Sequence, residues 1–486
     1  MDGIFGHNRS DGTDRLLAVY GGDVIRVSNG AGYGQNLTPD VKAEFEAFLD
    51  RAWFVNGTDK NRYFNGTTWT STGNSVDFPL AKYIKRFRTR LYVADINYLS
   101  TDYDSRVWYS DLPDNNDITW GYETHDNLQQ TLDSAVVRAP GALFKSKNIK
   151  VGDPFTITTG PNAGEYKVAS IDSETQITLT ENLATSDPAD TYWVGGNWFD
   201  VATNDNDIIY GFGENSDRLL IFKRESFFRF DGNTLRQVKG YPGTTSGRSV
   251  VNVRGWTFWF HPTGIWRYDG SEAVLISRAI QDYIDGISAT NYADIVAWRV
   301  GEKLRMYVGD ISNSDADITL DNAYLEYDTV TQTWTPGTYG KALTCATTFI
   351  ESSAQNIYLG DDDDEVFQDD TGNSDDTSPI NWRGETGWHF PQGTQAELEF
   401  TRAFVHAKRG RGINVKYKLY GPKGEDKEWR PLNDLEDSFT VLRMSPREGT
   451  FGRGINFLFI ESSTNKPPVI ERIDQFYRIR TLRALP

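Results

Sequence analysis

The chain has 486 residues, of which 38% are hydrophobic and 13% aromatic, so it is long enough for two or three folding units with packed cores. Its formal net charge of -18 argues against sequence-specific binding to nucleic acid. The single cysteine, Cys345, excludes an internal disulfide, and the lack of any run of 18 apolar residues predicts no insertion into a membrane.

The first pattern along the chain is a strand–turn–strand unit that recurs every few tens of residues. In four copies, aromatic or β-branched residues precede Asp-Gly, Asn-Gly or Asp-Thr, and a second strand follows; Asp-Gly and Asn-Gly tolerate the positive φ of a tight hairpin. Two further copies, at residues 19–25 and 357–361, are degenerate. One hairpin cannot bury both of its faces, so the repetition predicts the blades of a β-propeller. We expect about six blades; a pair of unrelated β-sandwiches is the alternative. The copies lie at residues 19–25, 63–69, 228–235, 266–271, 325–334 and 357–361.

Within these repeats we expect Trp69, Trp266 and Trp334 to be largely buried, because each belongs to a strand of the repeated hairpin. Helical patterns are few. Residues 39–51 place apolar side chains on one helical face, and residues 276–287 form the second helical pattern.

Two stretches interrupt the repeats. Residues 121–196 contain short alternating segments separated by Gly, Pro, Asn and Asp, and these predict a small antiparallel barrel or sandwich inserted into one blade. Residues 369–379 are polar and rich in turn formers, which predicts a linker. The expected all-β chain therefore consists of a first propeller part (1–120), the inserted β domain (121–196), a second propeller part (197–375) and a C-terminal β-sandwich (376–486).

Recognised catalytic motifs are missing from the sequence. The five histidines include no pair at helical i, i+4 spacing, and neither a Gly-x-Ser-x-Gly elbow nor a phosphate-binding loop is present. We therefore predict that the chain is not an enzyme, has no catalytic residues and needs no cofactor. Carboxylates are abundant, so a propeller glycosidase that uses paired acids is a less favoured alternative.

The sharpest local feature is an acidic run. Hard cations such as Ca²⁺ prefer several carboxylate oxygens, so this run is a candidate metal loop. The spacing does not match an EF-hand, and a solvated turn between two strands is the favoured interpretation. The run consists of Asp361, Asp362, Asp363, Asp364 and Glu365.

Residues 200–287, with an earlier blade at 106–120, resemble the tail-nozzle, tail-tubular and head-stabilisation β-propeller proteins of short-tailed bacteriophages. The resemblance is one of packing motifs and covers about half of the chain. It implies a structural virion protein of the phage tail, a nozzle that closes the distal end below the portal and adaptor rings and forms a channel for DNA ejection. The segments that carry it include Asp207-Ile208-Ile209-Tyr210-Gly211, Gly247-Arg248-Ser249-Val250 and Gly264-Ile265-Trp266-Arg267-Tyr268-Asp269-Gly270.

The resemblance also implies partners: further copies of the chain in a homohexameric ring, an adaptor or head-to-tail connector protein, and tail fibre or spike proteins. Assembly would take place in the host cytoplasm, and DNA would pass through without specific binding. An acidic lining suits such passage, because it repels phosphate. The candidate channel-facing residues are Asp361, Asp362, Asp363, Asp364, Asp375 and Asp376. A receptor-binding or fibre-anchoring tail protein is the alternative.

Overall fold

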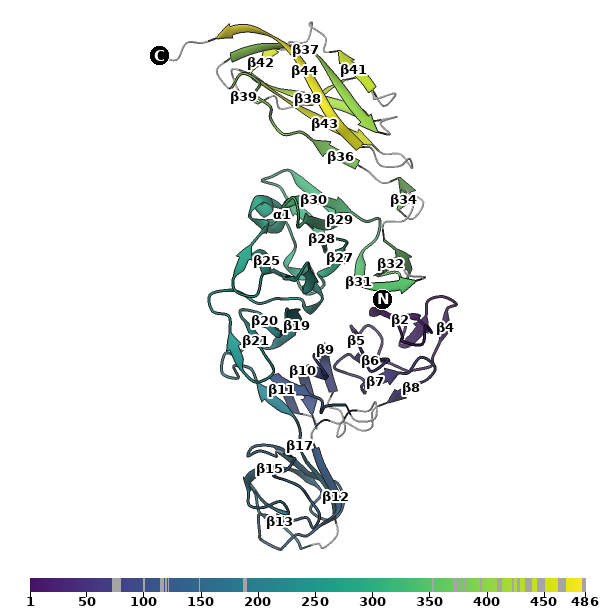
Figure 1. Cartoon of the computed structure of the whole chain (residues 1–486), viewed down its shortest axis with the longest axis vertical. Coiled ribbons are helices and arrows are strands. Elements are labelled where there is room, and N and C mark those ends of the chain that lie inside the picture. Colours follow the sequence, from purple (N-terminus) through teal and green to yellow (C-terminus); the bar gives the residue numbers. More distant parts are fainter. Residues whose placement is uncertain are drawn as a thin grey trace. The chain divides into compact units, whose positions relative to one another are not determined.

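A computed structural model gives the fold of the chain (Figure 1). Nearly all of its regular structure is β-strand, which confirms the all-β class. The chain separates into two compact units, Met1–Asp369 and Asp370–Pro486, so the first unit ends before the boundary expected at residue 375. The residues that the structure describes are 1–71, 80–98, 101–113, 118, 120, 122–147, 149–186, 190–351, 354–369, 374–375, 378–379, 382–393, 396–408, 413–421, 424–425, 429–432, 439–443, 451–461 and 469–482.

Among the described residues of the first unit, seven small antiparallel sheets form the blades of a propeller. Blade 1 has β1 (Gly3–His7), β2 (Arg15–Tyr20), β3 (Asp23–Arg26) and β4 (Ala31–Gly32), and blade 2 has β5 (Glu44–Phe48), β6 (Arg51–Val55), β7 (Arg62–Phe64) and β8 (Trp69–Ser71). Blade 3 has β9 (Leu80–Phe87), β10 (Arg90–Tyr98), β11 (Thr101–Tyr109) and β18 (Trp198–Asp200), and blade 4 has β19 (Ile209–Asn215), β20 (Arg218–Lys223), β21 (Phe227–Phe230) and β22 (Leu235–Gln237).

The remaining three blades follow in chain order. Blade 5 has β23 (Val251–Val253), β24 (Trp256–His261), β25 (Gly264–Tyr268) and β26 (Ala273–Leu275), and blade 6 has β27 (Val296–Val300), β28 (Lys303–Asn313), β29 (Ile318–Asp328) and β30 (Thr333–Thr338). Blade 7 has β31 (Leu343–Glu351), β32 (Ala354–Asp361) and β33 (Val366–Gln368). The short 3₁₀ helix η1 (Gly247–Ser249) joins blades 4 and 5.

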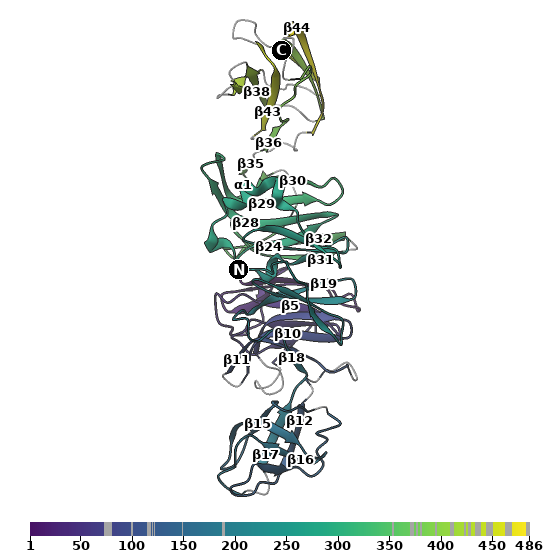
Figure 2. The same ribbon diagram turned by 90° about the vertical axis from the view of Figure 1, so that its left-hand side faces the viewer.

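The ring of blades closes between blade 7 and blade 1, where β31 packs beside β1 (Figures 1 and 2). The Gly6 amide donates to Thr347 Oγ1 at 3.1 Å, and Asn8 Nδ2 donates to the Ile350 carbonyl at 2.8 Å. Seven blades correct the expected six. The blade without a repeat in the sequence is blade 3, because a long stretch of chain separates its third strand, β11, from its fourth strand, β18, and no continuous hairpin motif marks it.

In blades 2, 4, 5 and 6, the repeated motif of the sequence forms the outer hairpin, between the third and fourth strands, whereas the degenerate copy at 19–25 joins β2 to β3 and the one at 357–361 belongs to β32. In blade 4, the Asp231 carboxylate accepts hydrogen bonds from the Asn233 and Thr234 amides at 3.0 and 2.8 Å. Gly232 follows with φ of 100°, a conformation that glycine adopts without steric cost. Asn65, Asp269 and Asp328 accept the equivalent pairs of amide hydrogen bonds in blades 2, 5 and 6.

The three tryptophans expected to be largely buried are only half-buried. Trp69 and Trp334 lie on the fourth strands of their blades, at the outer edge, where fewer side chains cover them. Trp266 lies on the third strand of blade 5 and packs against the hydrophobic cluster between blades 4 and 5. The fully buried tryptophans are Trp53, Trp193 and Trp259.

The helical expectation was wrong for residues 39–51 and right in part for residues 276–287. Residues 44–48 form β5, whose hairpin to β6 turns through Leu49 and Asp50 with positive φ. Blade 2 packs between blades 1 and 3, and this tertiary packing favours a strand although the periodicity of the sequence is helical. The second region contains the 3₁₀ helix η2 (Ser277–Ile280) and the helix α1 (Gln281–Asp285), and the 3₁₀ helix η3 (Ala289–Asn291) follows.

Residues 122–195 form the small antiparallel β domain inserted between β11 and β18. Its sheet order is β12-β17-β14-β15-β16-β13, and a bridge between Gln129 and Arg138 joins the two end strands into a barrel. The barrel encloses a core that includes Phe144, Phe155 and Tyr192. Its strands are β12 (Tyr122–Leu128), β13 (Val136–Arg138), β14 (Pro154–Ile157), β15 (Gly164–Ile171), β16 (Gln176–Leu179) and β17 (Asp190–Gly195).

The second unit is a β-sandwich preceded by a hairpin of β34 (Ser374–Asp375) and β35 (Ser378–Pro379). One sheet contains β36 (Trp382–Glu385), β43 (Gly454–Glu461), β38 (Asn414–Gly421), β39 (Gly424–Glu425) and β40 (Arg430–Pro431). The other contains β41 (Phe439–Arg443), β37 (Ala396–Lys408), β42 (Phe451–Gly452) and β44 (Val469–Leu482). Side chains such as Leu398 and Val415 alternate into one shared core between the two sheets.

Candidate functional site

The axis of the propeller holds a polar cavity of about 520 Å³. Its wall consists mainly of the first strands of the blades, which run along the axis, so that every second side chain points into it. Charged groups line the cavity from four places in the sequence: Glu44 and Glu46 on β5, Lys85 on β9, Arg248 in the connection between blades 4 and 5, and Arg299 on β27.

Arg248 bridges blades that are distant in the sequence. Its Nη1 donates to the Thr344 carbonyl at 2.9 Å, and its Nη2 donates to the Asp2 and Ala43 carbonyls at 2.6 and 2.9 Å. Its Nε lies 3.5 Å from Glu44 Oε1. One guanidinium group therefore ties blades 1, 2 and 7 to the connection before blade 5, which fixes the position of the Glu44 carboxylate.

The neighbouring Gly247 permits this close approach. A Cβ atom at Gly247 would lie 2.3 Å from the Tyr210 carbonyl oxygen, so a larger residue cannot occupy the position without movement of blade 4. The sequence motif Gly247-Arg248-Ser249 thus has two structural roles: its glycine allows the chain to pass close to β19, and its arginine extends across the axis to the other blades.

The two glutamates of β5 lie in different electrostatic environments. Burial raises the pKa of Glu44, and the Arg248 guanidinium opposes that shift. Glu46 pairs with Lys85 at 3.2 Å, and this carboxylate raises the pKa of the Lys85 ammonium group. Tyr83 on β9 is also close by, and burial raises the pKa of its hydroxyl well above the ordinary value. Two carboxylates in unlike environments are a common arrangement for acid–base chemistry.

The acidic run of the sequence forms the turn from β32 to β33, away from this cavity. Asp361 is fully buried, and its Oδ1 accepts a hydrogen bond from the Glu365 amide at 2.7 Å. Lys341 places its ammonium group 3.5 Å from Asp361 Oδ2 and 3.7 Å from Asp363 Oδ2, and it also pairs with Glu365. A lysine thus occupies the place where a bound cation would balance these charges.

The structure places the acidic run of the sequence outside the lining of the axial cavity. Within the part of the chain that it describes, the lining of the axial cavity includes none of Asp361, Asp362, Asp363 and Asp364, and no group of three metal-ligating side chains occurs. Asp375 belongs to the short strand β34, whose side chains are not described, and Asp376 lies outside the described residues.

The residues of the axial cavity were missed because residues 39–51 suggested a helix. The alternation Glu44-Phe45-Glu46-Ala47 was the available signal, since it places both glutamates on one face of a strand and Phe45 on the other. Arg248 belonged to a recognised motif, but its reach across the axis depends on ring closure and has no signature in the sequence.

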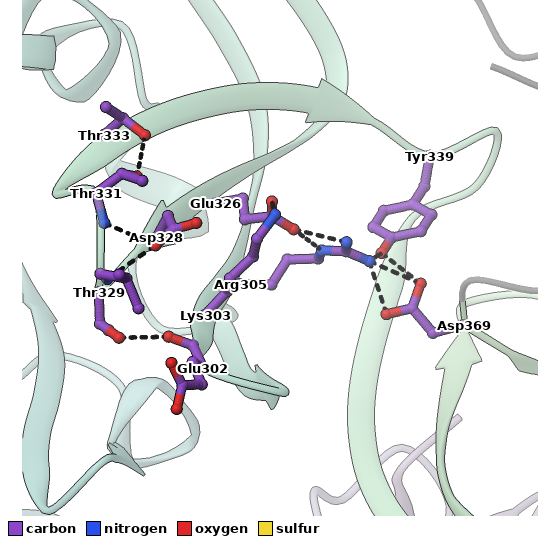
Figure 3. A network of polar contacts seen from close by, with 11 residues as sticks. Glu302, Lys303, Arg305, Glu326, Asp328, Thr329, Thr331, Thr333, Tyr339 and Asp369 are labelled. Carbon is purple, nitrogen blue, oxygen red and sulfur yellow. Dashed lines mark hydrogen bonds and ion pairs between the residues drawn. The ribbon is translucent and has the colours of Figure 1, made fainter. Parts of the chain in front are cut away.

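A second polar cluster lies at the end of the propeller chain (Figure 3). Arg305 on β28 donates from Nη1 to both carboxylate oxygens of Asp369, at 3.0 and 2.8 Å, and from Nη2 to Glu326 at 2.7 Å. Tyr339 donates to Asp369 at 2.9 Å, and Lys303 pairs with Glu326 at 2.6 Å. These charges balance one another, so the cluster anchors the end of blade 7 to blade 6.

Comparisons with known proteins give no family for the chain. No family model matches it, and no curated protein matches it. Among solved structures, it is similar to the Trypanosoma rangeli sialidase (10% identity, 100% of this chain and 95% of that chain, TM-score 0.28). It is also similar to a streptogramin B lyase (11% identity, 74% and 89%, TM-score 0.36) and to the phage phi92 endosialidase (11% identity, 79% and 53%, TM-score 0.23). The chain thus spans about half the length of that endosialidase.

The expectation that the chain is not an enzyme requires correction. The solved structures just named are two sialidases and a lyase, so proteins with similar β-rich chains include enzymes. The expectation depended on the absence of nucleophile and metal motifs, but hydrolysis by a pair of carboxylates leaves no such motif in a sequence. At these identities and TM-scores, the comparisons bear on the fold and assign no activity.

Proposed function

We propose that the protein is a structural component of a short bacteriophage tail, in which copies of the chain form a homohexameric ring that acts as the nozzle for DNA ejection. The proposal starts from the resemblance of residues 200–287, which form blades 4 and 5 and the connection between them. That connection contains Arg248, whose hydrogen bonds join it to three other blades of the propeller.

The size of the axial cavity favours a DNA path through a ring of several copies and argues against a path through a single propeller. A space of about 520 Å³ crossed by Arg248 is too small for a DNA duplex, so the duplex would have to pass between copies arranged around a common axis. Closed cyclic symmetry with heterologous contacts produces such a tube. Six copies carry a formal charge of -108, six times -18, which favours passage of DNA without retention.

Cryo-electron microscopy of the intact particle tests this proposal. A six-fold ring on the tail axis, below an adaptor ring and with a wall that is acidic or neutral, is the expected result. A peripheral position would reject the nozzle and favour the receptor-binding or fibre-anchoring alternative. A ring wall dominated by Lys and Arg would also contradict the proposal, because such a wall would bind the duplex.

A second candidate function is hydrolysis of a polysaccharide in the axial cavity. Glu44 and Glu46 are two residues apart on β5, so their Cα atoms are about 7 Å apart and both side chains face the cavity. Burial raises the pKa of Glu44, as a general acid requires, while Glu46 forms an ion pair with Lys85 at 3.2 Å. This pairing is the observation that favours the second candidate.

Release of reducing ends from host capsular polysaccharide tests this second function. We expect Glu44→Gln and Glu46→Gln each to lower the rate by at least about 100-fold, as is typical of general acid–base groups. Glu302→Gln is the matched control, since Glu302 is an exposed carboxylate paired with Arg254 on the propeller surface. Equal rates in all four proteins would exclude the axial cavity as the site of hydrolysis.

A further inference from the structure

Three arginines converge on one small pocket of blade 4. Arg218 begins β20, Arg229 lies on β21 and Arg236 lies on β22, and together with Asp231 and Thr234 they line a space of about 140 Å³. Arg229 and Arg236 are direct cross-strand partners. We call these five residues the arginine pocket.

Like charges directly opposite each other on neighbouring strands destabilise a sheet. Most cationic side chains that line the axial cavity or the blade contacts have a carboxylate partner, as Lys85 and Arg305 do. Within the described residues, by contrast, none of the three guanidinium groups of the arginine pocket forms an ion pair with a carboxylate. The arrangement is notable in a chain of net charge -18, which has ample carboxylates to offer.

Two groups of the arginine pocket, Arg218 and Asp231, are held in position by hydrogen bonds to their surroundings. Arg218 donates from Nη1 to the Gly270 carbonyl at 3.1 Å, which fixes its guanidinium against blade 5. The Asp231 carboxylate accepts the Asn233 and Thr234 amides, and these hydrogen bonds lower its pKa. Asp231 is therefore an ionised group committed to its own turn, and the formal charge of the pocket lining is +2, from three arginines and one aspartate.

We propose that the arginine pocket binds a compact oxyanion, and specifically a phosphate group. A phosphate carries about -1.5 to -2 charge near pH 7 and offers several acceptor oxygens, which matches converging guanidinium forks. The Thr234 hydroxyl at the rim provides a further donor. Binding of the anion would offset the repulsion between Arg229 and Arg236. The positive potential of the three guanidinium groups would therefore increase the affinity for phosphate.

The phosphate could be free inorganic phosphate or the phosphate of a sugar phosphate, since both present the same oxyanion to the pocket. The open rim, where Arg236, Asp231 and Thr234 are exposed, leaves room for an attached sugar. Neither source depends on the tail proposal or on the axial cavity, because the arginine pocket lies on the second, third and fourth strands of blade 4 and the turn between the last two.

Calorimetric titration and thermal unfolding of the full chain at low ionic strength test the proposal. With inorganic phosphate as the probe, we expect saturable binding and a rise in melting temperature as the ligand stabilises the folded state. Arg229→Gln and Arg236→Gln should each weaken phosphate binding by about tenfold or more, the usual effect of losing one charged hydrogen bond. Glucose 6-phosphate, titrated in parallel, separates the two sources: tighter binding than inorganic phosphate favours the sugar phosphate, and weaker binding favours the free anion.

Arg278→Gln is the matched control, because it removes the same charge from an exposed position on η2 outside the pocket. Without phosphate, Arg229→Gln should melt at the same temperature as the unmodified chain or higher, since it relieves like-charge repulsion, and this distinguishes lost binding from failed folding. Arg236→Gln, at an exposed position, serves if Arg229→Gln does not fold. The proposal is overturned if sodium chloride at equal ionic strength reproduces the phosphate effect, or if Arg278→Gln weakens binding as much as the pocket variants.

Discussion

The ammonium group of Lys223 lies 2.7 Å from the Asp205 carboxylate, and the lysine side chain is fully buried. It also donates to Ser105 Oγ and to the Ala202 and Asp207 carbonyls, at 2.9, 2.9 and 3.0 Å. One cation thereby holds together the segment that leads from β18 of blade 3 into blade 4. A buried lysine is tolerated only with such a set of oxygen partners.

Replacement of this lysine should destabilise the propeller. We expect Lys223→Met to lower the free energy of unfolding by about 3 kcal/mol, because several buried oxygens lose their donor. Lys239→Met, at an exposed position on blade 4, should change it by less than about 0.5 kcal/mol. Urea unfolding followed by tryptophan fluorescence gives both values. A Lys223→Met protein as stable as the control would mean that water replaces the ammonium group without cost.

The Arg305–Asp369 pair provides a second test of how the propeller is held together. Arg305 and Asp369 are both buried. Asp369→Ala removes one of the two carboxylates that pair with Arg305 and leaves the cluster with one uncompensated positive charge, so it should cost about 3 kcal/mol. Glu302→Gln breaks the exposed Arg254–Glu302 pair and should cost less than about 1 kcal/mol. The measurement is chemical unfolding at neutral pH; similar losses in the two variants would contradict the anchoring role.

Because Asp95 is a buried carboxylate with a raised pKa, we expect its contribution to stability to depend on pH. Burial raises its pKa to about 6, although Lys82 Nζ lies 3.7 Å away and opposes the shift. The unfolded chain has the ordinary pKa near 4, so the folded state binds the proton more tightly and the contribution of Asp95 becomes less favourable as pH rises from about 4 to about 6. Above pH 7 this cost is constant, on the order of 3 kcal/mol.

Asp95→Asn should therefore stabilise the protein at pH 8 and have little effect at pH 4. Asparagine also suits the positive φ of 53° at this position. Melting temperatures of the two proteins across this pH range provide the test, with Asp315→Asn at an exposed turn as the control. A difference between Asp95→Asn and the unmodified chain that does not change with pH would exclude the raised pKa.

Substitution of two glycines distinguishes the cost of a steric clash from the cost of a positive φ at a residue with a Cβ atom. Gly196 connects the inserted domain to β18 with φ of 137°, and a Cβ there would lie 1.8 Å from Trp108 Cζ2. Gly255 has φ of 81°, and a Cβ added to it would meet no atom within 4 Å. We expect Gly196→Ala to cost roughly 3 kcal/mol or more and Gly255→Ala about 1–2 kcal/mol, measured by chemical unfolding. Equal costs would show that Trp108 moves aside freely.

The sequence by itself determined the class of fold, because its main signals are local. Asn65, Asp231, Asp269 and Asp328 each close a turn with their own neighbouring amides, so the outer hairpins could be identified without knowledge of the rest of the chain. The alternation within residues 154–179 likewise predicted a separate small β domain, since short hairpin strands need only each other to pair.

Only the tertiary structure decided the number of blades and the location of the charged sites. Blade 7 lies beside blade 1 although more than 300 residues separate them in the sequence, and blade 3 obtains its fourth strand, β18, from beyond the inserted domain. Arg248 finds its carbonyl partners, and Arg229 meets Arg236 and Arg218, through strand register and ring closure. A local sequence pattern does not reveal these contacts, because the distance between two side chains in the folded ring does not depend on their separation along the sequence.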